Sequence, residues 1–183
     1  MLQKKGEKNL KVVIINGQGG IGKNTFVGYC IKVHDNVQSI SLVNEIKYVA
    51  KLLGWKGSKT KKDRKFLNDL KQLTTKYNNF PFESVALNIS NILEKCKECD
   101  KSTKDLIIFI HAREPEDIRY LVNKYDAKTL LIRKSGLAKK YGNPADDKVF
   151  DIDYDYIVYN DSTEEVLKEE AEKFIEKILG QDK

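Results

Sequence analysis

A glycine-rich segment near the start of the chain carries the clearest chemical signal. Residues 17–25 read Gly-Gln-Gly-Gly-Ile-Gly-Lys-Asn-Thr, and Gly17, Gly22 and Lys23 have the spacing of a phosphate-binding loop. Glycines let successive backbone N–H groups turn toward a phosphate, and the amino end of a following helix adds positive charge. Lys23 supplies a mobile charge for the β- and γ-phosphates. The segment therefore predicts binding of a nucleoside triphosphate.

Every residue of this loop is a predicted ATP-binding residue, and Lys23 is also a predicted catalytic residue. Asn24 stands where a serine or threonine usually follows the lysine and holds Mg²⁺ through its hydroxyl. We therefore assign no direct metal ligand and expect Mg²⁺ to be bound through ATP, with a contact from Thr25 left open. The predicted ATP-binding residues are Gly17, Gln18, Gly19, Gly20, Ile21, Gly22, Lys23, Asn24 and Thr25.

The elements around the loop alternate between strands and helices. Apolar, β-branched runs predict strands over residues 10–16, 37–43, 106–110, 129–132 and 156–159. Helical periodicity predicts helices over residues 22–33, 44–53, 62–77 and 82–97, a helix from Pro115, and a last helix opened by a capping box at Ser162–Glu165. This order predicts one α/β domain over residues 1–183 with a doubly wound, parallel, five-stranded sheet. Such sheets bind ligands at the carboxyl ends of their strands.

Length, composition and cysteine content set the class of protein. With 183 residues and 40% hydrophobic content, the chain can bury a sizeable core without disulfides. The first residues lack the apolar core of a signal peptide, and no run has the length of a membrane span. Cys96 and Cys99 have metal-ligand spacing, but no second pair accompanies them. We expect reduced thiols rather than zinc, a redox role for the pair being the minor alternative, in a cytoplasmic protein without a membrane partner.

Charge is distributed unevenly along the chain. Ten basic residues lie between Lys47 and Lys76 against two aspartates, whereas residues 151–183 hold eleven acidic residues and four lysines. Most of these side chains are expected on solvated helix faces. The basic segment can also gather an anionic substrate. A nucleic-acid-binding face is less favoured, because few aromatic residues are interspersed and no nucleic-acid-binding motif is present.

Two segments outside the loop are expected to complete a site for phosphoryl transfer. Helices over about residues 44–104, inserted between the second and third strands, would hold the acceptor, with Arg64 as a bidentate phosphate clamp. The loop resembles that of nucleoside monophosphate kinases, in which the segment after the fourth strand carries a lid, and this resemblance implies a short lid over residues 133–148 hinged at Gly136 and Gly142. Arg133 is its strongest candidate contact, since it stands at a strand end and faces the expected ligand site.

The order of these motifs resembles the deoxynucleoside monophosphate kinases of bacteriophages, within the P-loop kinase superfamily. Besides the loop, the similar segments are Asn44-Glu-Ile-Lys47, Asp63-Arg64, His111-Ala-Arg113-Glu-Pro-Glu-Asp117, Asn143-Pro-Ala-Asp146 and residues 153–163. The resemblance implies transfer of the ATP γ-phosphoryl group to a (deoxy)nucleoside monophosphate, with ATP and Mg²⁺ as cofactors. It also implies that Lys23, Arg113 and Arg133 are catalytic, and that the acceptor is bound by Asn44, Lys47, Arg64 and Arg113.

Two positions depart from the pattern of that family. His111 stands where its third strand ends in an acid that commonly orients Mg²⁺-bound water, and Asn44 stands where an aspartate is more usual. These differences leave two alternatives open: a kinase of another small phosphorylated metabolite, and a catalytically silent nucleotide-binding protein. The sequence also leaves open whether the protein forms a homodimer.

Overall fold

The computed structural model describes residues 10–98, 103, 105–135 and 148–180. The chain divides into two compact units, one formed by Met1–Ser39 together with Ser102–Lys183 and the other by Ile40–Lys101. The glycine-rich loop belongs to the first unit. The helices that follow the second strand belong to the second unit.

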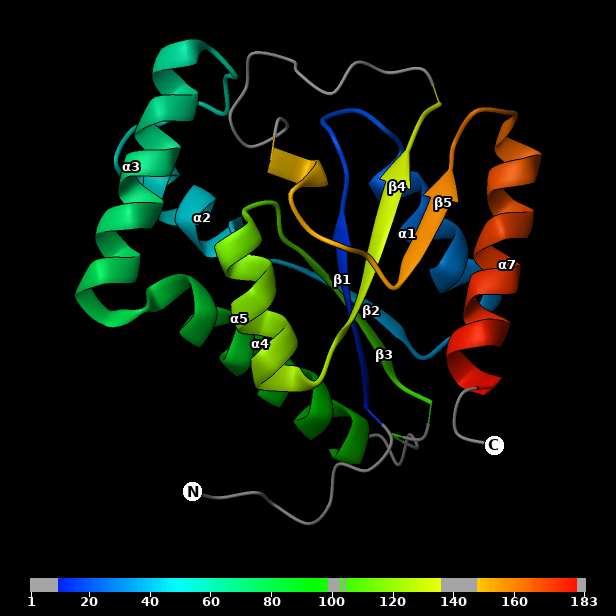
Figure 1. Ribbon diagram of the computed structural model, residues 1–183. Coiled ribbons are helices and arrows are strands. Elements are labelled where there is room, and N and C mark those ends of the chain that lie inside the picture. Colours follow the sequence, from blue (N-terminus) through cyan, green and yellow to red (C-terminus); the bar gives the residue numbers. More distant parts are fainter. Residues whose placement is uncertain (1–9, 99–102, 104, 136–147, 181–183) are drawn as a thin grey trace. The chain divides into compact units, whose positions relative to one another are not determined.

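A five-stranded parallel sheet is the centre of the fold, and its strand order is β2-β3-β1-β4-β5 (Figure 1). In register, Ile15 of β1 pairs with His111 of β3 on one side and with Leu130 of β4 on the other. The predicted doubly wound α/β fold is thus confirmed. The strands are β1 (Lys11–Asn16), β2 (Val37–Ser41), β3 (Ile107–His111), β4 (Lys128–Arg133) and β5 (Tyr156–Tyr159).

Helices cover both faces of this sheet because its central strands are apolar on both sides. Helices α1 (Lys23–Val33) and α7 (Glu164–Gly180) pack against each other on one face, and α5 (Pro115–Tyr125) packs against β1 on the other (Figure 1). The ring of Phe174 lies in the core of the first face, with its centroid 5.7 Å from that of Phe26 and 5.3 Å from that of Tyr156.

Some element boundaries differ from the sequence-based expectation. Strand β2 ends at Ser41 rather than at residue 43, because the carbonyl of Val43 already accepts the N–H of Lys47 in the next helix. The last helix begins at Glu164, and the carbonyl of Thr163 accepts the N–H of Leu167. Thr163, rather than Ser162, therefore precedes this helix. The residue three positions after it is Val166, whose side chain is apolar, so the predicted Ser162–Glu165 capping box was wrong.

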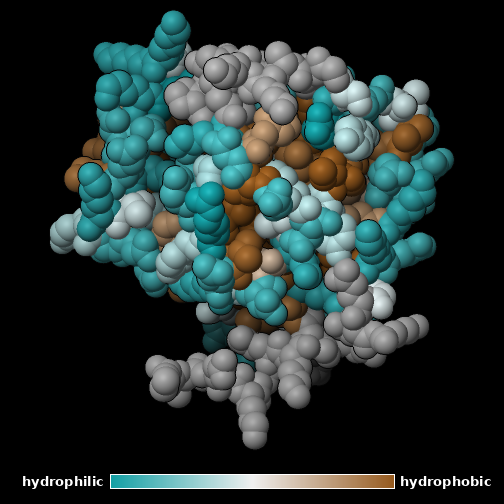
Figure 2. All heavy atoms as spheres, viewed as in Figure 1, coloured by the Kyte–Doolittle hydropathy of each residue, from teal (hydrophilic) through white to brown (hydrophobic). Residues whose placement is uncertain are grey.

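The second unit consists of three helices that contact one another: α2 (Asn44–Leu52), α3 (Lys61–Asn78) and α4 (Phe80–Glu98). Thr60 and Asp63 form a capping box at the start of α3, in which each side chain accepts the other's backbone N–H. Helix α3 has no buried residue, whereas α4 buries Phe82, Val85 and Ile89. Figure 2 shows hydrophilic side chains along α3, as expected for a solvated basic helix.

Candidate functional site

The carboxyl ends of three neighbouring strands bring the predicted site residues of the first unit together. Asn16, His111 and Arg133 are the last residues of β1, β3 and β4, which are adjacent in the sheet. The glycine-rich loop follows Asn16 directly, and Arg113 lies two residues beyond His111. Because the strands are parallel, these segments meet at one edge of the sheet, where folds of this kind bind ligands.

The loop needs glycine at defined positions for backbone reasons. Gly17, Gly20 and Gly22 have φ values of +145°, +76° and +96°, which residues other than glycine rarely adopt. A Cβ at position 17 would also lie 2.3 Å from the carbonyl oxygen of Ile132 in β4, and one at position 22 would lie 2.5 Å from Nδ2 of Asn160. The loop therefore packs closely on the ends of β4 and β5.

Helix α1 presents its amino end to this loop. Gly22 occupies the cap position in a left-handed conformation, no side chain caps the helix, and its first turn holds no acidic residue among the residues described. The positive end of the helix thus faces no capping carboxylate. Nζ of Lys23 donates to the carbonyl oxygens of Gly17 and Gln18, at 2.6 and 2.7 Å. The ammonium group lies over the loop, and Asn24 and Thr25 are exposed beside it.

A buried amide joins the loop to two other segments. The Asn16 side chain, 0% exposed, accepts the N–H of Gly17 through Oδ1 at 2.7 Å. Its Nδ2 donates to the carbonyl of Arg113 at 3.3 Å and to the hydroxyl of Tyr154 at 2.7 Å. The Tyr154 hydroxyl donates in turn to the carbonyl of Val149 at 2.8 Å. Burial raises the pKa of Tyr154, which keeps this donor protonated.

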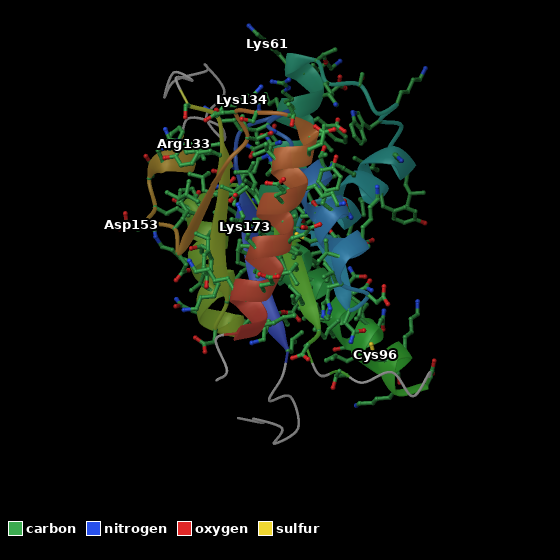
Figure 3. The ribbon with its side chains drawn as sticks, turned by 90° about the vertical axis from the view of Figure 1, so that its right-hand side faces the viewer. Lys61, Cys96, Arg133, Lys134, Asp153 and Lys173 are labelled. Atoms are coloured by element: carbon green, nitrogen blue, oxygen red, sulfur yellow. The ribbon has the colours of Figure 1, made fainter. Side chains whose placement is uncertain are left out.

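Arg133 lies close to two aromatic rings at the end of β4. Its guanidinium carbon is 5.4 Å from the ring centroid of Phe150 and 5.3 Å from that of Tyr159. Figure 3 shows Arg133 beside the 3₁₀ helix η1 (Lys148–Phe150). Within the described part of the chain, its Nε is buried and has no hydrogen-bond partner. The predicted position at a strand end is therefore correct, and cation–π contacts engage the charge.

The first residues after β4 are held by an aspartate that follows β5. Both the backbone N–H and the hydroxyl of Ser135 donate to Asp161, each at 2.6 Å. The hydrogen bond from the Ser135 hydroxyl contributes most to lowering the pKa of Asp161. The backbone hydrogen bond and the charges of Lys134 and Arg133 lower it further. A carboxylate therefore lies near Arg133 and keeps this region from being purely cationic.

His111 faces the neighbouring strand. Its Nε2 lies 3.2 Å from the hydroxyl oxygen of Ser39 in β2. The ring is half-buried. His111 pairs in register with Ile15, two residues before the glycine-rich loop, so it lies at the same end of the sheet as this loop. An imidazole thus occupies the strand end where the resemblance implies a carboxylate.

The remaining predicted acceptor residues lie in the second unit. Asn44 and Lys47 are exposed one turn apart on α2, and Arg64 is exposed in the first turn of α3. The capping box fixes the start of α3, and the Arg64 N–H donates to the carbonyl of Thr60 at 3.0 Å. The pKa of Asp63 is lowered by hydrogen bonds from Thr60 and Ser58, so this cap is ionised above acidic pH.

Several predictions fall on residues outside those that the structure describes. They concern most of the lid (136–147), including both of its predicted hinge glycines, and Cys99 of the cysteine pair. Among the described residues, no group of three His, Cys, Asp or Glu side chains could hold a metal ion. Burial raises the pKa of the Cys30 thiol to about 12, so this cysteine stays protonated.

Sequence reasoning missed three polar residues that hold the site. Asn16 and Tyr154 form the junction described above, and Nδ2 of Asn160 donates to the carbonyl of Ile21 in the loop at 2.9 Å. A polar residue that closes an apolar strand was a usable signal for Asn16. Each of the three also bonds a residue about 100 or more positions away in the sequence, and periodicity and spacing could not identify those contacts.

Comparison with known proteins adds no assignment to this geometry. The sequence matches no family model, and a search of curated proteins found no significant relative. No helix in the described part of the chain combines the length and apolar character needed to cross a membrane.

Proposed function

We propose that this protein is a phosphotransferase that moves the γ-phosphoryl group of ATP to a (deoxy)nucleoside monophosphate. The observation that carries the proposal is the conformation of the loop between β1 and α1. Three glycines there have positive φ, a helix amino end without a side-chain cap follows, and the Lys23 ammonium lies over the loop carbonyls. A phosphate is the ligand for which such a loop is suited.

The proposed roles follow from the charges that develop during transfer. Lys23 and the loop amides would stabilise the transferring phosphoryl group, while Mg²⁺ would reach the site with ATP and neutralise the phosphate oxygens. Arg133, at the end of β4, and Arg113, after β3, would contact phosphates from neighbouring strands. No general base is needed, because a phosphate monoester is already largely ionised near pH 7, with a second pKa of about 6.

The second unit would supply the acceptor contacts in this proposal. Its exposed cations include Lys47 on α2 and Arg64 at the capped start of α3. Arg64 suits a bidentate contact to a phosphate better than a lysine would, because its guanidinium is a planar fork of donors. The excess of basic residues between positions 47 and 76 would raise the local concentration of an anionic acceptor.

The decisive experiment is ATP/Mg²⁺ turnover against a panel of ribo- and deoxyribonucleoside monophosphates, with other small phosphorylated metabolites alongside. Lys23→Met is the matched inactive control, since it removes the charge and keeps a flexible side chain of similar length. We expect transfer to at least one monophosphate and a loss of orders of magnitude in the control. Equal turnover by both proteins would reject the assigned loop.

A catalytically silent nucleotide-binding protein is the second candidate, and His111 is the observation that favours it. A neutral imidazole orients Mg²⁺-bound water poorly, and here it lies 3.2 Å from the Ser39 hydroxyl. This candidate expects ATP binding without transfer to any acceptor in the panel. His111→Asp tests the histidine directly: higher Mg²⁺-dependent turnover would mark a weakened metal site. Lost turnover with the fold preserved would show that the histidine has a role of its own.

A further inference from the structure

The buried Asn16 side chain uses both of its N–H donors and accepts one hydrogen bond at a single point. Both N–H groups of its amide are donors, to the Arg113 carbonyl and to the Tyr154 hydroxyl, while its oxygen accepts the N–H of Gly17. An amide has two such donors, so neither is left over. The residue is 0% exposed, and water therefore cannot replace a lost partner easily.

The Tyr154 hydroxyl extends this network toward Arg133. It accepts from Asn16 and donates to the carbonyl of Val149, which is fully buried in η1. The next residue, Phe150, makes a cation–π contact with Arg133, whose guanidinium carbon is 5.4 Å from its ring centroid. One path of direct contacts thus runs from the entry of the phosphate loop, through a tyrosine and η1, to the arginine at the end of β4.

We propose that Tyr154, held by Asn16, is a positioning residue that sets Arg133 relative to the phosphate loop. This inference rests on the proposed phosphotransferase function. The physical reason is that phosphoryl transfer requires the charged groups to be positioned accurately, since a displacement of about 1 Å can lower the rate about 100-fold. The hydrogen bonds of Tyr154 in the described part of the chain join it to Asn16 and to the carbonyl of Val149, both of which lie outside residues 17–25. Tyr154 acts on the site through the position of η1 and the ring of Phe150.

Tyr154→Phe tests this inference because it removes only the hydroxyl. We expect kcat to fall about tenfold with a smaller change in the KM for ATP, as for a group whose effect is felt mainly in the transition state. Thr129→Val is the matched control. It removes a hydroxyl that donates to Asp155 at 2.8 Å and so links β4 to the residue before β5. This bond lies near the amino end of β4, whereas Arg133 lies at its carboxyl end. Thr129→Val should lower the melting temperature and leave kcat unchanged.

A double-mutant cycle separates positioning from general destabilisation. In an Arg133→Ala background, Tyr154→Phe should lower kcat by less than about twofold, because its target is gone. An equal loss in both backgrounds would overturn the proposal, as would a Thr129→Val variant that loses as much kcat as Tyr154→Phe.

The wild-type protein distinguishes this failure from failure of the proposed function. If it transfers phosphate to no acceptor but binds ATP, the function is rejected and the same cycle is measured on the Kd for ATP by calorimetry. Tyr154→Phe should then weaken ATP binding only when Arg133 is present. Equal weakening, or none, in both backgrounds would overturn the positioning role, and absence of ATP binding would overturn both proposals.

Discussion

Replacing Gly17 with alanine should be among the most damaging single-methyl changes in this protein. The backbone there has φ +145°, and the added Cβ would lie 2.3 Å from the carbonyl oxygen of Ile132 and 3.0 Å from Cγ2 of Ile21. The Ile132 oxygen belongs to the backbone of β4, which is paired to strands on both sides. It cannot move aside as a flexible side chain would.

Two independent costs add at this position. A non-glycine residue forced to positive φ loses about 1–2 kcal/mol, and a methyl group forced into a packed site costs about 1–3 kcal/mol. The sum, about 2–5 kcal/mol, is a large part of the roughly 5–15 kcal/mol that stabilises a typical domain. Gly20→Ala shares only the first cost, because no atom lies within 4 Å of its added Cβ. Gly28→Ala, inside α1, shares neither and should stabilise by about 0.5–1 kcal/mol.

Urea denaturation of the three variants and the wild type checks this ranking. The free energy of unfolding should be lowest for Gly17→Ala, intermediate for Gly20→Ala and highest for Gly28→Ala, with similar m-values. A Gly17→Ala protein as stable as Gly20→Ala would refute the argument, since it would mean that the loop does not contact β4 as described. Failure of Gly17→Ala to fold while the other two variants fold agrees with the ranking.

Two further predictions concern charge. Arg64→Ala should raise the acceptor KM and lower kcat, which corresponds to a loss of about 1.5–3 kcal/mol in transition-state binding, while ATP affinity stays nearly unchanged. Arg64→Lys should restore only part of this loss. A changed ATP affinity with unchanged acceptor kinetics would contradict the prediction. Burial raises the pKa of Asp155, but hydrogen bonds from Thr129 and the charge of Lys128 outweigh it and lower the pKa overall. The stabilisation of the folded state by the ionised Asp155 should be complete above about pH 3.9 and be lost as the pH falls through the lowered pKa of the folded state. Asp155→Asn should therefore make the melting temperature fall less steeply at acidic pH. An unchanged dependence of the melting temperature on acidic pH would show that Asp155 makes no such contribution.

Local sequence signals predicted the elements well, because each element is specified by its own residues. The apolar run before Gly17 placed β1 within one residue of its observed bounds, and the predicted start of the periodic last helix lies within two residues of Glu164. The overlooked capping box at the start of α3 was also local, since Thr60 and Asp63 have the spacing of this motif. Strand β2 was predicted two residues too long, because an apolar pair can continue a strand or lead into a helix and only the fold decides between them.

The contacts that build the candidate site depend on residues far apart in the chain, and the loop glycines illustrate why spacing alone could not describe them. Gly17 is required by the backbone of β4 and by its positive φ. Gly22 is required by the side chain of Asn160 and by its positive φ, and Gly20 by its positive φ alone. The motif therefore contains two kinds of information, one for binding phosphate and one for packing the loop on neighbouring strands. A substitution at Gly17 tests the packing, whereas one at Lys23 tests the phosphate chemistry. On a chain without the Ile132 carbonyl nearby, the same motif would keep its suitability for phosphate and lose this packing contact at Gly17, where the positive φ would still favour glycine.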